Sequence, residues 1–191
     1  MVVRRVWLLA ALLGVACRPA AASEVPGLPL VVVAGDHAQT LDARSLAAGA
    51  PITVLVFFSA DCHYLDAHEP RLRALYDEDH PRGVQFAMVD SEVRASPERD
   101  AEEARRHGYP FPILYDAHAR LADALGAEYA GYAVVLDAGG HVRYRGGIDS
   151  DKTHLRDDAA MYLRDAVDAL LDHREPPVVE AKTLGCALQK W

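Results

Sequence analysis

The chain has 191 residues, of which 51% are hydrophobic and 25% are charged, and this composition argues against a disordered, collagen-like or disulfide-scaffold protein. The length suits one domain of roughly 100–200 residues and leaves no room for several. The formal net charge is -8, and no cluster of Lys and Arg follows the first residues, so we do not expect binding to nucleic acid or to an anionic membrane surface.

Residues 1–22 have the composition of a secretory signal. Two arginines precede an apolar run over residues 6–16, which is shorter than the ~20 residues needed to span a bilayer. Cleavage after the alanines at 20–22 would release a soluble chain, whereas residues 12–17 resemble a lipoprotein box in which Cys17 is lipidated. In both cases we expect an extracytoplasmic protein of the periplasm or cell envelope, held at a membrane only through a possible lipid anchor.

Residues 23–175 are expected to form the folded domain. We predict strands over 52–58, 83–90, 133–137 and 141–145, with shorter apolar segments at 28–34 and 113–116. Helices are predicted over 42–47, 63–79, 97–107, 121–125 and 155–173. Pro70 should kink or restart the second of these helices. Alternating strands and helices followed by a hairpin and a helix indicate an α/β sandwich with a mixed sheet.

Two stretches of the predicted helices are dense in charge, at 77–79 and over 98–106. Dense charge on a helix is typical of a solvated face, and the mixed signs over 98–106 suit ion pairs, so we expect both stretches to be exposed and without a catalytic role. The glycine pairs do not form a phosphate-binding G-x-G-x-x-G motif after a strand, and no cofactor is expected.

Cys62 lies where the predicted buried strand at 52–58 ends and the next helix begins. An exposed thiol at this position meets free N–H groups and the positive end of the helix dipole, which lower its pKa and make the nucleophilic thiolate available. The alternative is an inert buried cysteine. If Cys17 leaves with the signal or carries a lipid, Cys62 and Cys186 are the remaining thiols, and they can pair in one way only.

Several segments carry a family resemblance through their order and spacing. They are Cys62 at a strand end, the strand over 84–90, the stretch Phe111–Asp116, the hairpin over 134–145, the stretch Tyr144–Asp149 and the late Thr183–Cys186. Together they resemble the thioredoxin-like redoxin proteins, exported bacterial relatives of the peroxiredoxins in the alkyl hydroperoxide reductase and thiol-specific antioxidant group. The resemblance covers residues 25–190. It implies a thioredoxin-like three-layer sandwich with redox or antioxidant chemistry at Cys62 and a second role for Cys186.

The chain departs from the relatives at three places. It has no C-x-x-C motif, so Cys186 in the tail, residues 176–191, is the internal candidate for a resolving thiol. Ser59 matches the Ser or Thr three residues before a peroxiredoxin cysteine, but Leu55 stands where such proteins have Pro. Gly131 stands where thioredoxin folds place a cis-Pro opposite the cysteine.

The resemblance implies a stepwise mechanism. The Cys62 thiolate attacks a small oxidant such as a peroxide, or a partner's disulfide, and Cys186 then resolves the product into a Cys62–Cys186 bridge. An external thiol reductant then resets the bridge, and a partner disulfide protein is the other expected partner. The alternative is a static disulfide that ties the tail to the domain. The supporting residues are expected to be Ser59, Asp61, His63 and Gly131.

Histidines near Cys62 raise a second class of function. His63 and His68 lie close to Cys62 in the sequence, and His154 lies far along the chain. A thiolate with imidazoles suits copper or zinc, so the alternative is a non-catalytic or metal-binding member of the fold with Cys62, His63 and His68 as ligands. This set falls short of the four ligands of a structural zinc site. His63 alternatively lies in solvent or modulates the neighbouring thiol.

Overall fold

The computed structural model describes residues 23–34 and 37–191, so the expected signal and Cys17 lie outside the described residues. The strands are β1 (Pro29–Ala34), β2 (His37–Asp42), β3 (Ile52–Phe58), β4 (Val84–Asp90), β5 (Ile113–Tyr115), β6 (Ala133–Asp137) and β7 (Val142–Gly146). The helices are α1 (Ala43–Ala48), α2 (His63–Asp79), α3 (Pro97–His107), α4 (Arg120–Leu125) and α5 (Tyr162–Leu171), with 3-10 turns at His80–Arg82 and Ala117–Ala119.

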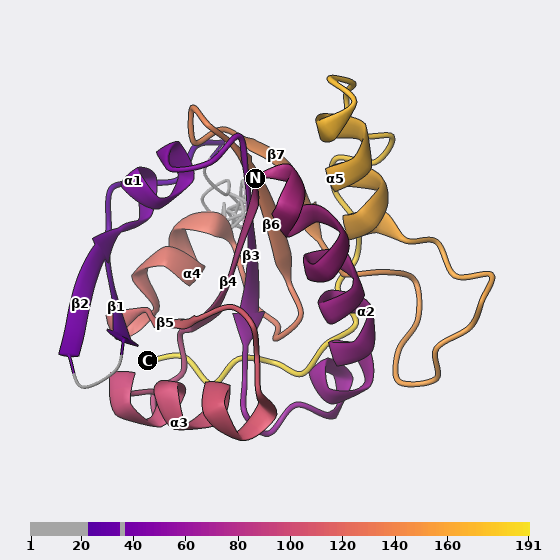
Figure 1. Ribbon diagram of the computed structural model, residues 1–191. Coiled ribbons are helices and arrows are strands. Elements are labelled where there is room, and N and C mark those ends of the chain that lie inside the picture. Colours follow the sequence, from indigo (N-terminus) through magenta and orange to yellow (C-terminus); the bar gives the residue numbers. More distant parts are fainter. Residues whose placement is uncertain (1–22, 35–36) are drawn as a thin grey trace, which may run out of the picture.

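The strands form one mixed sheet of seven strands in the order β2-β1-β5-β4-β3-β6-β7. Strands β3, β4 and β5 are parallel, and the remaining pairs are antiparallel. Helices α2 and α5 lie side by side on one face, and α1 and α4 lie on the other (Figure 1). The predicted α/β three-layer sandwich with a central mixed sheet is therefore confirmed.

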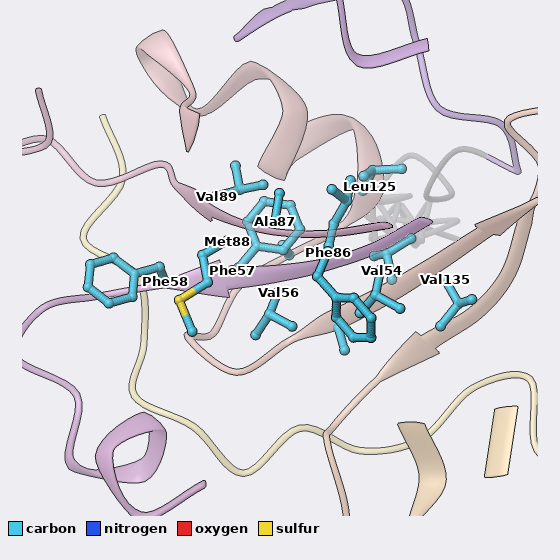
Figure 2. Packing of buried hydrophobic residues seen from close by; sticks show 14 of the residues in the cluster. Val54, Val56, Phe57, Phe58, Phe86, Ala87, Met88, Val89, Leu125 and Val135 are labelled. Atoms are coloured by element: carbon cyan, nitrogen blue, oxygen red, sulfur yellow. The ribbon is translucent and has the colours of Figure 1, made fainter. Parts of the chain in front are cut away.

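Strand β3 is the centre of the core because it pairs with β4 on one side and β6 on the other. All seven of its residues are buried, as its β-branched and aromatic sequence predicts for a strand covered on both faces. Side chains along β3 and β4 point alternately to the two faces of the sheet (Figure 2). On one face Phe86 packs against Tyr76 of α2, with ring centroids 5.5 Å apart. Complete burial of a large apolar side chain stabilises a fold by about 1.5–3 kcal/mol.

Two helices have the bounds that their end signals predict. In α3, the Ser96 hydroxyl accepts the N–H of Arg99 at 3.3 Å, and Gly108 ends the helix in the left-handed conformation. Helix α2 runs from His63 to Asp79 as one element, so the predicted restart at Pro70 is wrong. Buried side chains before and after Pro70 hold the helix to the sheet: Leu65, His68, Leu72 and Leu75.

Two elements differ from the sequence prediction. Strand β2 was not predicted, because its residues are mostly exposed and polar and carry no hydrophobic alternation. Helix α5 begins at Tyr162 rather than at 155. The side chains of Asp149, Asp151 and Ser150 accept backbone N–H groups within the segment that precedes α5, and such bonds compete with helix formation.

The described helices include none with the length and apolar character of a membrane span. The charged runs are not wholly exposed as predicted. Asp79 is buried and accepts a hydrogen bond from Arg82 at 2.8 Å, and Asp100 is also buried. Tertiary packing buries both carboxylates, which a charge pattern alone does not reveal.

Candidate redox site at the end of β3

The structure joins Cys62 and Cys186 in a disulfide, although 124 positions separate them in the sequence. Their Cα atoms lie 5.7 Å apart, within the usual range for a disulfide. Cys62 follows β3 and is the N-cap residue of α2, as predicted. Its predicted exposure is wrong, because Cys62 has 0% exposed surface, whereas Cys186 is half-buried. The tail that brings Cys186 to the site also covers Cys62.

The C-terminal tail crosses the site without regular secondary structure, and Figure 1 shows it as the yellow segment that passes the ends of β3 and β4. The N–H of Ala130 donates to the carbonyl of Cys186 at 2.8 Å, and the N–H of Leu188 donates to the carbonyl of Glu128 at 3.0 Å. Farther along the tail, the N–H of Val93 donates to the carbonyl of Gln189 at 2.8 Å. Backbone pairing on both sides therefore holds Cys186 against the end of β3.

Gly131 lies between the tail and β3. Its N–H donates to the carbonyl of Phe57 at 2.7 Å, and its φ of +81° is in the left-handed region that favours glycine. A Cβ at this position would overlap the ring of Tyr64 on α2. A Cβ on Gly185 would similarly overlap the carbonyl oxygen of Ala130. Both glycines allow a close approach of the backbone that places the two cysteines together.

Gly131→Ala should destabilise the fold by about 2–4 kcal/mol, because the new methyl group adds a clash to the strain of a positive φ. The matched control is Gly108→Ala. Gly108 also has a positive φ, +64°, but a Cβ there would meet nothing within 4 Å. We expect the free energy of unfolding of this control to fall by about 1 kcal/mol. Urea unfolding of the two variants measures the difference in the free energy of unfolding. Equal decreases in the two variants would show that the Tyr64 ring moves aside without destabilising the fold.

The residues beside Cys62 have different surroundings. The carbonyl of Ser59 accepts the N–H of Cys62 at 3.3 Å, and both Ser59 and Asp61 line a small hollow together with Cys186. The side chain of His63 is 93% exposed, and its Nδ1 lies 3.6 Å from a carboxylate oxygen of Asp66. Ser59 and Asp61 are thus placed at the disulfide, whereas His63 lies in solvent.

His68 is buried and bonded on both sides of its ring. Its Nδ1 lies 2.8 Å from the carbonyl oxygen of Tyr64, and its Nε2 lies 3.0 Å from Asp149. Burial opposes ionisation of Asp149, but hydrogen bonds from His68 and Arg71 outweigh it and lower the pKa of Asp149. The ring of His68 thus ties α2 to the segment after β7 and offers no free nitrogen to a metal. Across residues 23–34 and 37–191, no group of three metal-ligating side chains gathers, so Cys62, His63 and His68 are not brought together as a ligand set.

A family model described as AhpC/TSA matches residues 23–145. The chain belongs to the AhpC/TSA family. The resemblance to redoxins read from the sequence is therefore confirmed, and the family and the cysteine pair together support a redox role. No curated protein matches this AhpC/TSA chain.

Solved structures resemble this AhpC/TSA protein over most of its length. An uncharacterized conserved protein of Geobacillus kaustophilus is 26% identical, with a TM-score of 0.77 over 92% of this chain and 94% of the other. A hypothetical protein of Sinorhizobium meliloti is 22% identical, with a TM-score of 0.75 over 91% and 97%. The thioredoxin domain of a thiol-disulfide oxidoreductase from Bacteroides vulgatus is 14% identical, with a TM-score of 0.51 over 73% and 91%. The distant matches show the shared thioredoxin-like fold.

A buried pair of carboxyl groups lies at the carboxyl end of β4, and sequence reasoning missed it. Asp90 ends β4 and Asp100 lies in the first turn of α3, and each is 1% exposed. No hydrogen-bond donor among the described residues faces either carboxyl oxygen of Asp100. Burial, together with the negative charge of Asp90, raises the pKa of Asp100 to about 9, so Asp100 keeps its proton at neutral pH.

Asp100→Asn should make the protein more stable at neutral and alkaline pH. In the unfolded chain Asp100 ionises near pH 4, whereas in the folded chain it keeps its proton to about pH 9. Stability of the native protein therefore falls as the pH rises through this window. An asparagine is neutral at every pH and so avoids this penalty. We expect the free energy of unfolding to rise by about 1–3 kcal/mol at pH 8 and to change little at pH 4.

Thermal unfolding from pH 4 to pH 9 checks this expectation. The control is Asp77→Asn, the same substitution at an exposed position of α2. A stability difference between Asp100→Asn and the native protein that stays constant with pH would show that Asp100 does not retain a proton in the fold.

Proposed function

We propose that this protein is an extracytoplasmic thiol-based oxidoreductase whose redox centre is the Cys62–Cys186 couple. The observation that carries the proposal is the disulfide between a cysteine at the end of β3 and a cysteine on the tail that crosses it. Cys62 begins a helix of 17 residues, whose N-terminus stabilises a thiolate. Membership of the AhpC/TSA family supports redox chemistry at this position.

In the reductive half-reaction, an external thiolate attacks the sulfur of Cys186. Cys62 has no exposed surface and cannot be the first sulfur attacked, whereas Cys186 lines an open hollow. The new bond joins the external sulfur to Cys186, and Cys62 leaves with the electron pair as a thiolate at the start of α2. A second external thiolate then releases Cys186 and leaves as the oxidised disulfide.

In the oxidative half-reaction, the Cys62 thiolate attacks a peroxide or a partner's disulfide. With a peroxide the O–O bond breaks, Cys62 becomes a sulfenic acid, and the other oxygen leaves as water or an alcohol. The Cys186 thiolate then attacks the Cys62 sulfur and expels hydroxide, which restores the disulfide. Because Cys62 has no exposed surface in the disulfide form, the tail has to move away from Cys62 after reduction so that the oxidant can reach it. The backbone contacts of the tail then bring Cys186 back beside Cys62 for the final step.

The extracytoplasmic location is inferred from the N-terminal residues. The signal-like composition of residues 1–22 directs export, and an oxidising compartment allows a disulfide to persist. Sequencing the N-terminus of the mature protein tests this part of the proposal. A terminus near Ser23 indicates ordinary cleavage, a lipid-modified Cys17 indicates an anchored protein, and an intact Met1 would contradict export.

Repeated cycling of the disulfide tests the redox function. The folded protein is reduced with a small dithiol, freed of reductant, and reoxidised with hydrogen peroxide or a small disulfide, while thiols are counted by alkylation and intact mass. We expect two thiols per chain after each reduction and none after each oxidation. A bridge that opens only after unfolding would instead show a static link between the tail and the domain.

A further inference from the structure

A small hollow lies against Cys186. It has a volume of about 240 Å³ and is lined by the turn after β3, the loop after β4, the start of α3 and the tail. Because Cys62 has no exposed surface, a reagent that opens the disulfide reaches Cys186 first, and the hollow provides the access. Ligand pockets commonly enclose roughly 300–1,000 Å³. The hollow therefore suits a molecule of few atoms.

Two side chains of opposite charge line this hollow without a partner in the part of the chain that the structure describes. Arg94, in the loop after β4, is exposed, and no acceptor faces its guanidinium. Asp61, in the turn before Cys62, is also exposed, and its carboxylate receives no hydrogen bond or ion pair. Both groups are free to bind a ligand that enters the hollow.

The other two charged side chains of the hollow already have partners. A carboxylate oxygen of Glu92 accepts the N–H of Gln189 at 3.2 Å, and Arg99 donates to the carbonyl of Arg94 at 3.2 Å. These bonds to the backbone fix the positions of Glu92 and Arg99. The side chains of Arg94 and Asp61 remain a cation and an anion without hydrogen-bond partners among the described residues, in a hollow that Cys186 also lines. This pattern complements a small molecule that carries both a carboxylate and an ammonium group.

We propose, on the basis of the redox function above, that the reductant of the disulfide is a small zwitterionic thiol of the amino-acid type. Arg94 binds its carboxylate, and Asp61 binds its ammonium group. Its thiolate attacks Cys186, the Cys62–Cys186 bond breaks, and Cys62 takes the electron pair. A second molecule attacks the bound sulfur and releases Cys186. Two thiols are oxidised to one small disulfide, and the protein disulfide is reduced to two thiols.

The test compares rates of reduction of the oxidised protein by four small thiols of different charge. They are cysteine (zwitterion), 3-mercaptopropionate (anion), cysteamine (cation) and neutral 2-mercaptoethanol. Rates are expressed per thiolate, corrected for thiolate basicity and divided by the rate with 2-mercaptoethanol for the same variant. The variants are Arg94→Gln and Asp61→Asn. The control is Arg105→Gln, an exposed arginine of α3 that lines a different hollow.

We expect Arg94→Gln to lower the relative rates with cysteine and 3-mercaptopropionate by about three- to tenfold, and Asp61→Asn to lower those with cysteine and cysteamine by a similar factor. Rates that follow thiolate basicity alone, or equal losses in Arg105→Gln, would overturn the proposal and leave the redox function standing. A native disulfide that none of the four thiols opens, although it opens after unfolding, would overturn the redox function as well.

Discussion

Cys62→Ser should lower peroxide- or disulfide-dependent oxidation of added thiol by at least about a thousandfold, because it removes the sulfur that forms and leaves every covalent intermediate. The remaining rate is that of the uncatalysed reaction. The measurement is the consumption of added thiol under saturating oxidant, with intact mass of the protein recorded during the reaction. No adduct or sulfenic acid should form at position 62 in this variant.

Cys186→Ser is the matched control, because it removes the same disulfide but keeps Cys62. When no thiol is added, it should form a sulfenic acid or a mixed disulfide at Cys62 in one rapid step and then stall, since no internal thiol resolves the product. If activity were lost only because the cross-link is missing, Cys62→Ser and Cys186→Ser would lose activity equally. In that case neither variant would form an adduct at position 62. Unchanged turnover in Cys62→Ser would remove the basis for an oxidoreductase.

Reduction of the disulfide should destabilise the fold by about 2–5 kcal/mol. The bridge joins positions 124 residues apart, and closing so long a loop restricts the unfolded chain strongly. For a protein of this length the loss corresponds to a fall in Tm of roughly 5–15 °C. Contacts that do not need the bridge limit the loss: Leu188 is only 8% exposed, and Lys190 contacts Asp123 at 2.8 Å.

Thermal unfolding with and without reductant measures this difference. The double variant Cys62→Ser with Cys186→Ser should unfold near the temperature of the reduced protein and should not respond to reductant. If the oxidised and reduced proteins unfold at the same temperature, the disulfide does not contribute to the stability of the fold, and the other contacts of the tail are sufficient.

Local sequence signals predicted the elements that carry the site. The buried run of β3, the helix after Cys62 and the capped start of α3 at Ser96 appear with their expected bounds, because hydrophobic runs and end signals act over a few residues. Strand β2 escaped prediction because an exposed edge strand needs no apolar alternation.

Features that depend on distant segments could not be read from the sequence. The burial of Cys62 results from a tail that pairs with the backbone of residues 128–130, and backbone pairing leaves little trace in side-chain composition. Asp100 sits in a run of charged residues whose alternation suggests a solvated face, yet it meets Asp90 from another element. In each case the local sequence predicted the helix correctly, but contacts with a distant segment determined whether the side chain is buried.

The reduction potential of the Cys62–Cys186 couple tests the central claim most directly. The protein is equilibrated in thiol-disulfide buffers of graded potential, trapped with an alkylating agent and scored by intact mass. A couple that cycles in function should titrate as a two-electron step between about -270 and -120 mV. A midpoint below about -300 mV would mark a structural bridge and would contradict the assignment of Cys62 and Cys186 as a redox pair.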